Sequence, residues 1–412
     1  MHSVSWNHAR ALLYRDGQAL PLPTEWVPLG QAIGRVLAEP VRTVLPVPHY
    51  DSSAMDGFAV SGPPPWQILW PAPAEPGENI HRQVSPLLPG QARPILTGGL
   101  LPPGADAVLR QEEALVTSHR LSPRSGAFSP ERPYPVAGAD IRRAGEELPA
   151  GSQVAQAGTL LSARHIGALG VLGLDWLTLY QQPRIAIAYT GNEVITSGLP
   201  QPGQVRDAFS LQFPQILADF GARCVSTTRL VDTQEDFFTW LTTAEADLLL
   251  LTGGSSTSSA DWLRRTLSEM GANYLFESVS VRPGHPALAA RLPHTANPAA
   301  PLVLGLPGNP LAAHTALYSY LPAWVAGCYG QDLQELPLGT LADAIPGYRK
   351  AELRLLPVTL DTRANGHVLT PLAKTRSHML TSFAYAQALA LIPAQGAEAG
   401  YQVPYLPLVS AH

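Results

Sequence analysis

The strongest constraint on the fold lies between residues 182 and 324, where short apolar runs alternate with helical patterns. Residues 247–252 (DLLLLT) are almost continuously apolar, as expected for a parallel strand buried on both faces. Residues 184–189 (RIAIAY) form a similar β run, and helical spacing follows in residues 211–220 and 261–270. This alternation predicts a parallel sheet with right-handed crossover helices.

The flanking segments have different patterns. Residues 58–135 consist of short strands broken by Pro and Gly, which indicates a compact β-rich domain. Residues 329–407 are again strand-rich, consistent with a small β-barrel. Apolar residues at helical spacing in residues 27–39 and 158–170 predict two further helices, one on each side of the β-rich segment.

Length and composition limit the classes of function. At 412 residues the chain exceeds the size that one hydrophobic core serves, so several domains are expected. A net charge of −5 supplies no basic field for nucleic acid. No apolar run approaches the roughly 20 residues of a membrane-spanning helix, and a secretory signal pattern is missing, so we expect a cytoplasmic protein. Cys224 and Cys328 are expected to be buried thiols rather than a disulfide or metal site.

Three polar motifs follow apolar runs of the predicted sheet. They are TGNE at 190–193, TGGSS at 252–256 and PGNP at 307–310. Ligands of open α/β sheets bind at the carboxyl ends of the strands, and glycines let backbone N–H groups face an anion there. The competing interpretation of the second motif is a Ser-rich surface loop. The candidate binding residues are Gly253, Gly254, Ser256, Pro307, Gly308 and Asn309.

Charged residues beside these motifs extend the candidate site. Glu193, Asp232 and Asp261 are carboxylates near the predicted strand ends, and phosphate among carboxylates implies a bridging Mg²⁺ or another divalent cation. Helix capping is the alternative role, above all for Asp261. Arg282, in VRPGHP, can bind a phosphate bidentately or form a surface ion pair.

The β-rich segment holds two further candidates. Asp56 follows a run of small residues in PVPHYDSSAMDGFAV (46–60) and precedes Gly57, so its carboxylate can hold a cation or a water, or simply close a hairpin. Thr97 lies in a Thr-Gly-Gly turn that can present a hydroxyl and N–H groups to an oxyanion, or form a β-turn without a ligand.

Taken in order, the segments at 46–60, 95–108, 189–195, 251–261 and 306–310 resemble those of the molybdopterin molybdenumtransferase family, the MoeA and gephyrin E-domain proteins. The resemblance implies an elongated four-domain α/β and β protein that forms a homodimer. Its parts would be an N-terminal domain (1–45 with 137–180), a β-rich inserted domain (46–136), a parallel-sheet molybdopterin-binding domain (181–327) and a C-terminal β-barrel (328–412).

The resemblance also implies a reaction, the insertion of molybdate into adenylylated molybdopterin with release of AMP. Asp56, Thr97 and Glu147 would act on the molybdate side. Glu193, Asp232 and Asp261 would hold the metal and the pterin nucleotide, while the glycine loops and Arg282 would hold phosphate. A molybdopterin adenylyltransferase or a molybdoenzyme is the implied protein partner.

This chain departs from the family pattern at several positions, which are Asn192, Ala208, Phe209, Ser278 and His285. Ser278 and His285 stand where the family has Lys, so permanent positive charge is missing near the expected nucleotide. These departures motivate a second hypothesis, a catalytically degenerate paralogue that binds pterin or finished cofactor as a carrier or assembly partner. A third, a nucleotide-processing enzyme that uses only the α/β domain, is disfavoured because Asp56 and Thr97 are retained.

Overall fold

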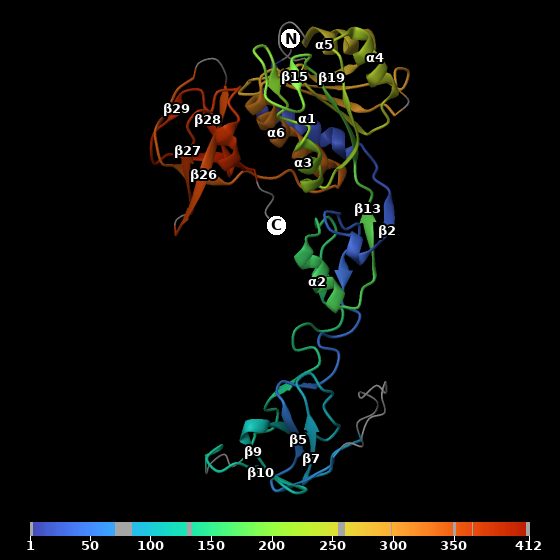
Figure 1. The fold of residues 1–412 in the computed structure, drawn as a ribbon, viewed down its shortest axis with the longest axis vertical. Helices are drawn as coiled ribbons and strands as arrows, with labels where there is room; N and C mark the ends of the chain where they lie inside the picture. The colour runs from blue at the N-terminus through green and yellow to red at the C-terminus, as the bar shows by residue number, and fades with distance from the viewer. Residues whose placement is uncertain are drawn as a thin grey trace. The chain divides into compact units, whose positions relative to one another are not determined.

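The computed structural model describes residues 3–70, 85–129, 134–253, 260–297, 299–348, 352–364 and 366–408 (Figure 1). The chain forms two compact units. Unit 1 contains Met1–Glu39, Ala157–Gly167 and Asp175–His412, and unit 2 contains Pro40–Gln156 and Ala168–Leu174.

Unit 1 is built on a six-stranded sheet with the order β17-β14-β18-β23-β22-β19. The first four strands are parallel, and β22 and β19 extend the sheet at one edge, where β22 pairs antiparallel with both β23 and β19. The expected parallel sheet is therefore present, with an antiparallel extension. The strands are β14 (Arg184–Tyr189), β17 (Arg223–Arg229), β18 (Leu248–Thr252), β19 (Asn273–Phe276), β22 (Leu288–Arg291) and β23 (Leu302–Leu306).

Side chains of the central strands alternate between two cores, because successive residues of a strand point to opposite faces. Ile185 and Ile187 pack against one set of helices, whereas Ala186 and Ala188 pack against the other. The first face is covered by α1 (Trp6–Gln18), α3 (Phe213–Asp219) and α6 (Pro310–Cys328). The second is covered by α4 (Gln234–Thr243) and α5 (Ala260–Glu269).

Helices α1 and α6 cross in close contact at two glycines. A Cβ atom at Gly17 would lie 2.1 Å from the carbonyl oxygen of Trp324, and one at Gly327 would lie 2.1 Å from that of Tyr14. Ser5 caps α1, its hydroxyl accepting a hydrogen bond from the His8 N–H at 3.3 Å. Sequence reasoning missed α1, and the Ser5 cap was the available signal.

The helix expected over residues 27–39 is wrong. This segment forms the end of β2 (Thr24–Pro28), which pairs with β13 (Trp176–Tyr180), and the short 3₁₀ helix η1 (Leu29–Gln31). Gly34 has φ +74°, which breaks a right-handed helix, and Val36 and Leu37 form isolated bridges instead. The second expected helix is present in shorter form as α2 (Ala163–Val171).

The C-terminal part of unit 1 is a closed five-stranded barrel, as expected. Its strands follow the order β26-β27-β24-β30-β28, and β28 pairs back with β26. They are β24 (Leu338–Leu341), β26 (Leu353–Arg363), β27 (Gly366–Pro371), β28 (Ala388–Pro393) and β30 (Gln402–Pro407). The short elements around the barrel and the sheet are β1 (Ser3–Val4), β15 (Val194–Ile195), β16 (Val205–Arg206), β20 (Ser278–Val279), β21 (Val281–Arg282), β25 (Ile345–Pro346), β29 (Gly396–Ala397) and η3 (Thr381–Tyr385).

Unit 2 is β-rich, as the Pro- and Gly-broken pattern predicts. A six-stranded sheet with the order β8-β5-β7-β6-β10-β9 surrounds a core that contains Trp66 and Leu109. Its strands are β5 (Gly57–Ser61), β6 (Trp66–Ile68), β7 (Gln91–Ile95), β8 (Ala107–Arg110), β9 (Ala114–Thr117) and β10 (Arg120–Pro123). The remaining elements are β3 (Val41–Arg42), β4 (Ser52–Ser53), β11 (Ile141–Arg142), β12 (Gln153–Ala155) and η2 (Gln111–Glu113).

Two expectations from composition bear on the whole chain. Within the described residues, no helix has both the length and the apolar character needed to cross a membrane. Cys328 is buried as expected, whereas Cys224 is only partly buried, at the edge strand β17.

Candidate functional site

The loops after β14, β18 and β23 meet at one edge of the sheet in unit 1. Thr190 donates from its backbone N–H and its hydroxyl to the Thr252 carbonyl oxygen, at 3.1 and 3.0 Å. Gly253 has φ +87°, and a Cβ atom there would lie 2.2 Å from the Thr190 hydroxyl oxygen. The corresponding position of Gly308 lies 3.5 Å from the Gly253 Cα. The structure thus brings together the three strand-end motifs singled out in the sequence.

Glu193 and Asp232 form a carboxylate pair beside these loops. Burial raises the pKa of Asp232 above its ordinary value; the backbone N–H groups of Asn192 and Gly191 oppose this, and the Glu193 charge raises it further. Oδ1 of Asp232 is buried without a hydrogen-bond partner in the described part of the chain. An unpartnered carboxylate oxygen next to a second carboxylate fits a hard divalent cation.

The third predicted acid and part of the glycine loop fall on positions that the structure does not describe. Gly254 and Ser256 lie outside the described residues, and so does the side chain of Asp261, near the start of α5. Among the described residues, no group of three or more acidic, His or Cys side chains is gathered around one point. The described part of the candidate metal centre is therefore the pair Glu193 and Asp232.

The PGNP motif directly precedes α6, and the first turn of that helix is hydrogen-bonded to a segment of the C-terminal barrel region. Pro307 is buried, while Gly308 and Asn309 are exposed. Asn309 is the N-cap residue, but its side chain makes no capping hydrogen bond. The N–H groups of Leu311 and Ala312 instead donate to the Ser377 carbonyl oxygen, at 2.9 and 3.2 Å. These first-turn donors of α6 are thus not free to bind a phosphate.

Sequence reasoning missed this segment of the barrel, which places two exposed cations near the start of α6. Lys374 and Arg376 lie three residues and one residue before Ser377. The signal was the rarity of lysine, since Lys350 and Lys374 are the two lysines of the whole chain.

Arg282 ends β21, which pairs with β26 of the barrel. Its side chain is partly buried, and its Nε has no hydrogen-bond partner among the described residues. The adjoining Gly284 faces the second turn of α6, because a Cβ there would lie 3.6 Å from the Thr315 hydroxyl oxygen. Arg282 therefore keeps hydrogen-bonding capacity, and the backbone two residues after it lies near α6.

The positions that depart from the family pattern have structural roles in this chain. Asp207 accepts hydrogen bonds from the N–H groups of Phe209 (2.7 Å) and Ser210 (3.0 Å), and it pairs with Arg229. Phe209 packs against Phe213 with ring centroids 5.1 Å apart, and its ring also lies near that of His314.

The two residues at expected lysine positions are also engaged. Ser278 is buried, and its strand pairs with β1 at Ser3. His285 contacts the Val279 carbonyl oxygen through Nδ1 at 2.6 Å. Both positions therefore support the local fold rather than supplying a permanent charge.

Unit 2 contains the other candidate centre, where Asp56, in the turn between β4 and β5, meets Thr97, in the turn after β7. Thr97 donates from its backbone N–H (2.6 Å) and its hydroxyl (2.8 Å) to Oδ1 of Asp56. These two hydrogen bonds lower the pKa of Asp56 below its ordinary value, with the backbone donor contributing most. Both residues are exposed and line an open depression together with Met55, Gln111, Glu112 and Arg124.

Glu147 also belongs to unit 2, but it is not among the residues that line this depression. It is exposed, and its backbone N–H donates to the Val47 carbonyl oxygen at 3.0 Å. The structure thus unites Asp56 and Thr97 directly and leaves Glu147 apart from their depression.

Three family models match consecutive parts of the chain. The MoeA N-terminal region (domain I and II) matches residues 4–173, a probable molybdopterin binding domain matches residues 186–325, and the MoeA C-terminal region (domain IV) matches residues 340–408. Together they span nearly all of the fold described above.

Curated relatives and solved structures agree with these matches. The molybdopterin molybdenumtransferase of Nostoc sp. is 32% identical over 315 residues, covering 72% of this chain and 68% of the relative. Molybdopterin molybdenumtransferase 2 of Mycobacterium tuberculosis is 31% identical, covering 70% and 71%. The crystal structure of the MoeA protein from Pyrococcus horikoshii, 22% identical, has the same fold with a TM-score of 0.72, covering 98% of this chain and 99% of the other. The chain therefore belongs to the molybdopterin molybdenumtransferase (MoeA) family.

Proposed function

We propose that this protein inserts molybdate into adenylylated molybdopterin and releases AMP, in the synthesis of the molybdenum cofactor. Family membership supports the reaction, and one structural observation carries the assignment of the site. Asp232 holds a buried, unpartnered carboxylate oxygen beside Glu193, next to the loops that contain Gly253 and Gly308. A site of this kind suits a phosphate-bearing substrate bound together with a cation.

Mg²⁺ is our proposed cation, held by Glu193 and Asp232 with Asp261 as the third acid. When bound, it would neutralise the carboxylates and polarise phosphate oxygens of the substrate. The chain's own residues supply the remaining orientation. Thr190 fixes the path of its loop against Thr252, and the missing side chain of Gly253 leaves room for the Thr190 hydroxyl.

Positive charge for the nucleotide comes, in our proposal, from Arg282 together with Lys374 and Arg376. Arg282 retains an unpartnered Nε, and the barrel segment that carries the other two residues is fixed to α6 through Ser377. Guanidinium and ammonium groups bind phosphate through charge-assisted hydrogen bonds. These three cations would replace the charge that Ser278 and His285 do not provide.

Asp56 and Thr97 are our proposed groups for the molybdate half of the reaction, with Glu147 as a third residue of unit 2. Two donors from Thr97 stabilise the Asp56 anion, so the carboxylate can accept a hydrogen bond from a water and orient it during exchange of molybdate oxygens for the pterin sulfurs. Thr97 acts through Asp56, since both of its donors face that carboxylate.

The larger assembly is proposed on the same basis. We propose a cytoplasmic homodimer with four domains, divided at residues 45, 136, 180 and 327, and a molybdopterin adenylyltransferase or a molybdoenzyme as its protein partner. Size-exclusion chromatography with light scattering tests the dimer, and limited proteolysis tests the domain limits.

The decisive experiment measures AMP release from adenylylated molybdopterin by the purified full-length protein. We expect release that requires both molybdate and Mg²⁺, and nucleotide binding that persists without molybdate. Tight binding of the adenylylated pterin without AMP release over hours would instead support the carrier hypothesis.

A further inference from the structure

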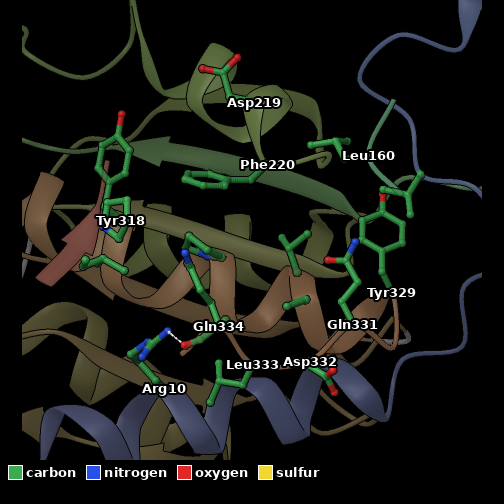
Figure 2. A pocket seen from close by; sticks show the side chains of 17 residues that line it. Arg10, Leu160, Asp219, Phe220, Tyr318, Tyr329, Gln331, Asp332, Leu333 and Gln334 are labelled. Carbon is green, nitrogen blue, oxygen red and sulfur yellow. Dashed lines mark hydrogen bonds between the residues drawn. The ribbon is translucent and has the colours of Figure 1, made fainter. Parts of the chain in front are cut away.

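A cavity of about 340 Å³ lies inside unit 1, along the C-terminal half of α6 (Figure 2). Phe220 lines it directly after α3 and before β17 begins, so the cavity opens near the amino end of that parallel strand. Tyr329, at the end of α6, lies about 30 Å along the helix axis from Asn309. The cavity is therefore distinct from the carboxyl-end loops that hold Glu193 and Asp232.

The walls of the cavity are largely aromatic and aliphatic. Phe220, Tyr318 and Tyr329 contribute rings from three sides, and Leu160 and Leu333 add aliphatic surface (Figure 2). A volume of this size lies within the range of about 300–1,000 Å³ that is common for small-molecule sites. The shape and lining suit a flat apolar body.

One buried cation faces this apolar space. Arg10, on α1, is only 6% exposed, and its guanidinium lies 4.7 Å from the centre of the Trp6 ring. Its Nη2 donates to the Gln334 carbonyl oxygen at 3.3 Å, while its Nε is buried without a partner. In the described part of the chain, no carboxylate forms an ion pair with Arg10.

An unpaired buried guanidinium is unfavourable, because protein replaces its hydration without returning a counter-charge. Burial accordingly lowers the pKa of Arg10, although the nearby Tyr320 phenol opposes this. An anionic ligand would supply both the missing charge and an acceptor for Nε.

The rim of the cavity limits how much negative charge a ligand can carry. Asp219 and Asp332 both line the cavity and are exposed at its edge. Their carboxylates would repel a second negative charge that remained outside the reach of Arg10. A single carboxylate is therefore favoured over a phosphate or a nucleotide.

We propose that this cavity is a binding site for a small monocarboxylate with a flat apolar body, whose carboxylate pairs with Arg10 while its body packs between Phe220, Tyr318 and Tyr329. The proposal does not depend on the proposed reaction, because the two sites share no residue.

The first test uses three probes that have the same ring system, measured against the full-length protein by calorimetry and ligand-observed NMR. They are 1-naphthaleneacetate, its neutral amide 1-naphthaleneacetamide, and 1-naphthyl phosphate. We expect saturable binding of the acetate, and at least tenfold weaker binding of the amide and the phosphate. Equal binding of acetate and amide, or no binding of the acetate at 5 mM, would overturn the proposal.

The second test replaces the cation while keeping its length. Arg10→Met should weaken binding of 1-naphthaleneacetate about ten- to hundredfold, because a charge-assisted contact is lost. Arg15→Met is the matched control, since Arg15 is exposed on the same helix. Retained binding in Arg10→Met, or an equal loss in Arg15→Met, would refute the site.

Thermal unfolding separates this ligand role from a structural one. Without ligand, Arg10→Met should unfold at the same temperature as the wild type or higher, since an unpaired buried charge is removed. A marked fall in the unfolding temperature would show that Arg10 serves the fold instead. AMP release should be unchanged in Arg10→Met, so failure of this site and failure of the proposed reaction remain distinguishable.

Discussion

The two candidate centres use aspartates whose pKa values move in opposite directions. Asp56, in unit 2, is exposed and receives two hydrogen bonds from Thr97, which lower its pKa. Asp232, in unit 1, is partly buried beside Glu193, and burial raises its pKa. One carboxylate is thus stabilised as an anion by its own unit, whereas the other is destabilised until a cation binds.

This difference follows from how each centre is built. Asp56 is completed by a turn 41 residues away within one small sheet, so its environment forms when unit 2 folds. Asp232 lies among loops that follow separate strands of the large sheet, and its Oδ1 has no partner in the described chain. The comparison predicts that the Asp56 carboxylate of unit 2 is stable as an anion without a ligand. The Asp232 carboxylate of unit 1 is predicted to be stable as an anion only when a cation is bound.

The largest effect is expected from Asp232→Asn. Loss of one proposed cation ligand should reduce AMP release on the order of 10³-fold, measured with saturating adenylylated molybdopterin, molybdate and Mg²⁺. Without divalent cations the variant should unfold at the same temperature as the wild type or higher at pH 7.5. The raised folded-state pKa means that ionised Asp232 costs stability, and this cost appears as pH rises through that pKa.

Glu235→Gln is the matched control for Asp232→Asn. Glu235 is exposed in the first turn of α4, three residues further along the chain. It should leave AMP release within about twofold of the wild type. Equal activity of Asp232→Asn and Glu235→Gln would remove Asp232 from the proposed cation site and end the contrast between the two aspartates.

Asp56→Asn should have the second largest effect. The amide keeps the size of the side chain and loses the charge, so binding of the adenylylated pterin should survive while AMP release falls about a hundredfold. Glu112→Gln, which alters another acid of the same depression, serves as the control. If both variants turned over at the wild-type rate, Asp56 would have no role beyond closing its turn.

Much of the α/β fold could be predicted from sequence, because strands buried on both faces consist of uninterrupted runs of apolar residues. The apolar run at residues 184–189 predicts a strand, and these residues form β14 with those limits. The same periodicity misled in residues 27–39, where pairing with β13, about 150 residues away, overrides a helical pattern. The apolar spacing within a short segment does not show which distant strand that segment will pair with.

The gathering of the strand-end loops could be predicted from the sequence, whereas the electrostatics of the candidate site could not. Strand-end topology placed the loops of Gly253 and Gly308 together, as the structure has them. The direction of the pKa shift at Asp232 depends on burial and on the Glu193 charge, which no motif encodes. The contact of Ser377 with α6 likewise joins segments more than 60 residues apart and left no local signal.

Gly253→Ala tests how tightly the loops of unit 1 are built. Its φ of +87° is strained for alanine, and the new Cβ would collide with the Thr190 hydroxyl. We expect a loss of about 2–4 kcal/mol in the free energy of unfolding, from backbone strain and overpacking together. Gly271→Ala is the control, since φ is +69° there with open space around the Cβ, and it should cost roughly 1 kcal/mol. Equal costs would mean that the Thr190 contact yields freely.

The smallest effect should come from Thr97→Val, which keeps the backbone donor to Asp56 and removes the hydroxyl donor. The pKa of Asp56 should then rise part of the way toward its ordinary value, because one of the two hydrogen bonds that favour the anion is lost. Carboxyl ¹³C NMR of the labelled protein follows this titration directly.

In the wild type the lowered pKa keeps Asp56 ionised until the pH falls through that value, so the acid limb of the rate profile should move to higher pH in the variant. Asp232 should titrate alike in both proteins, since it belongs to unit 1 whereas Thr97 belongs to unit 2. An unshifted Asp56 titration would assign the whole effect to the backbone N–H, and a shift in Asp232 as well would contradict the independence of the two centres.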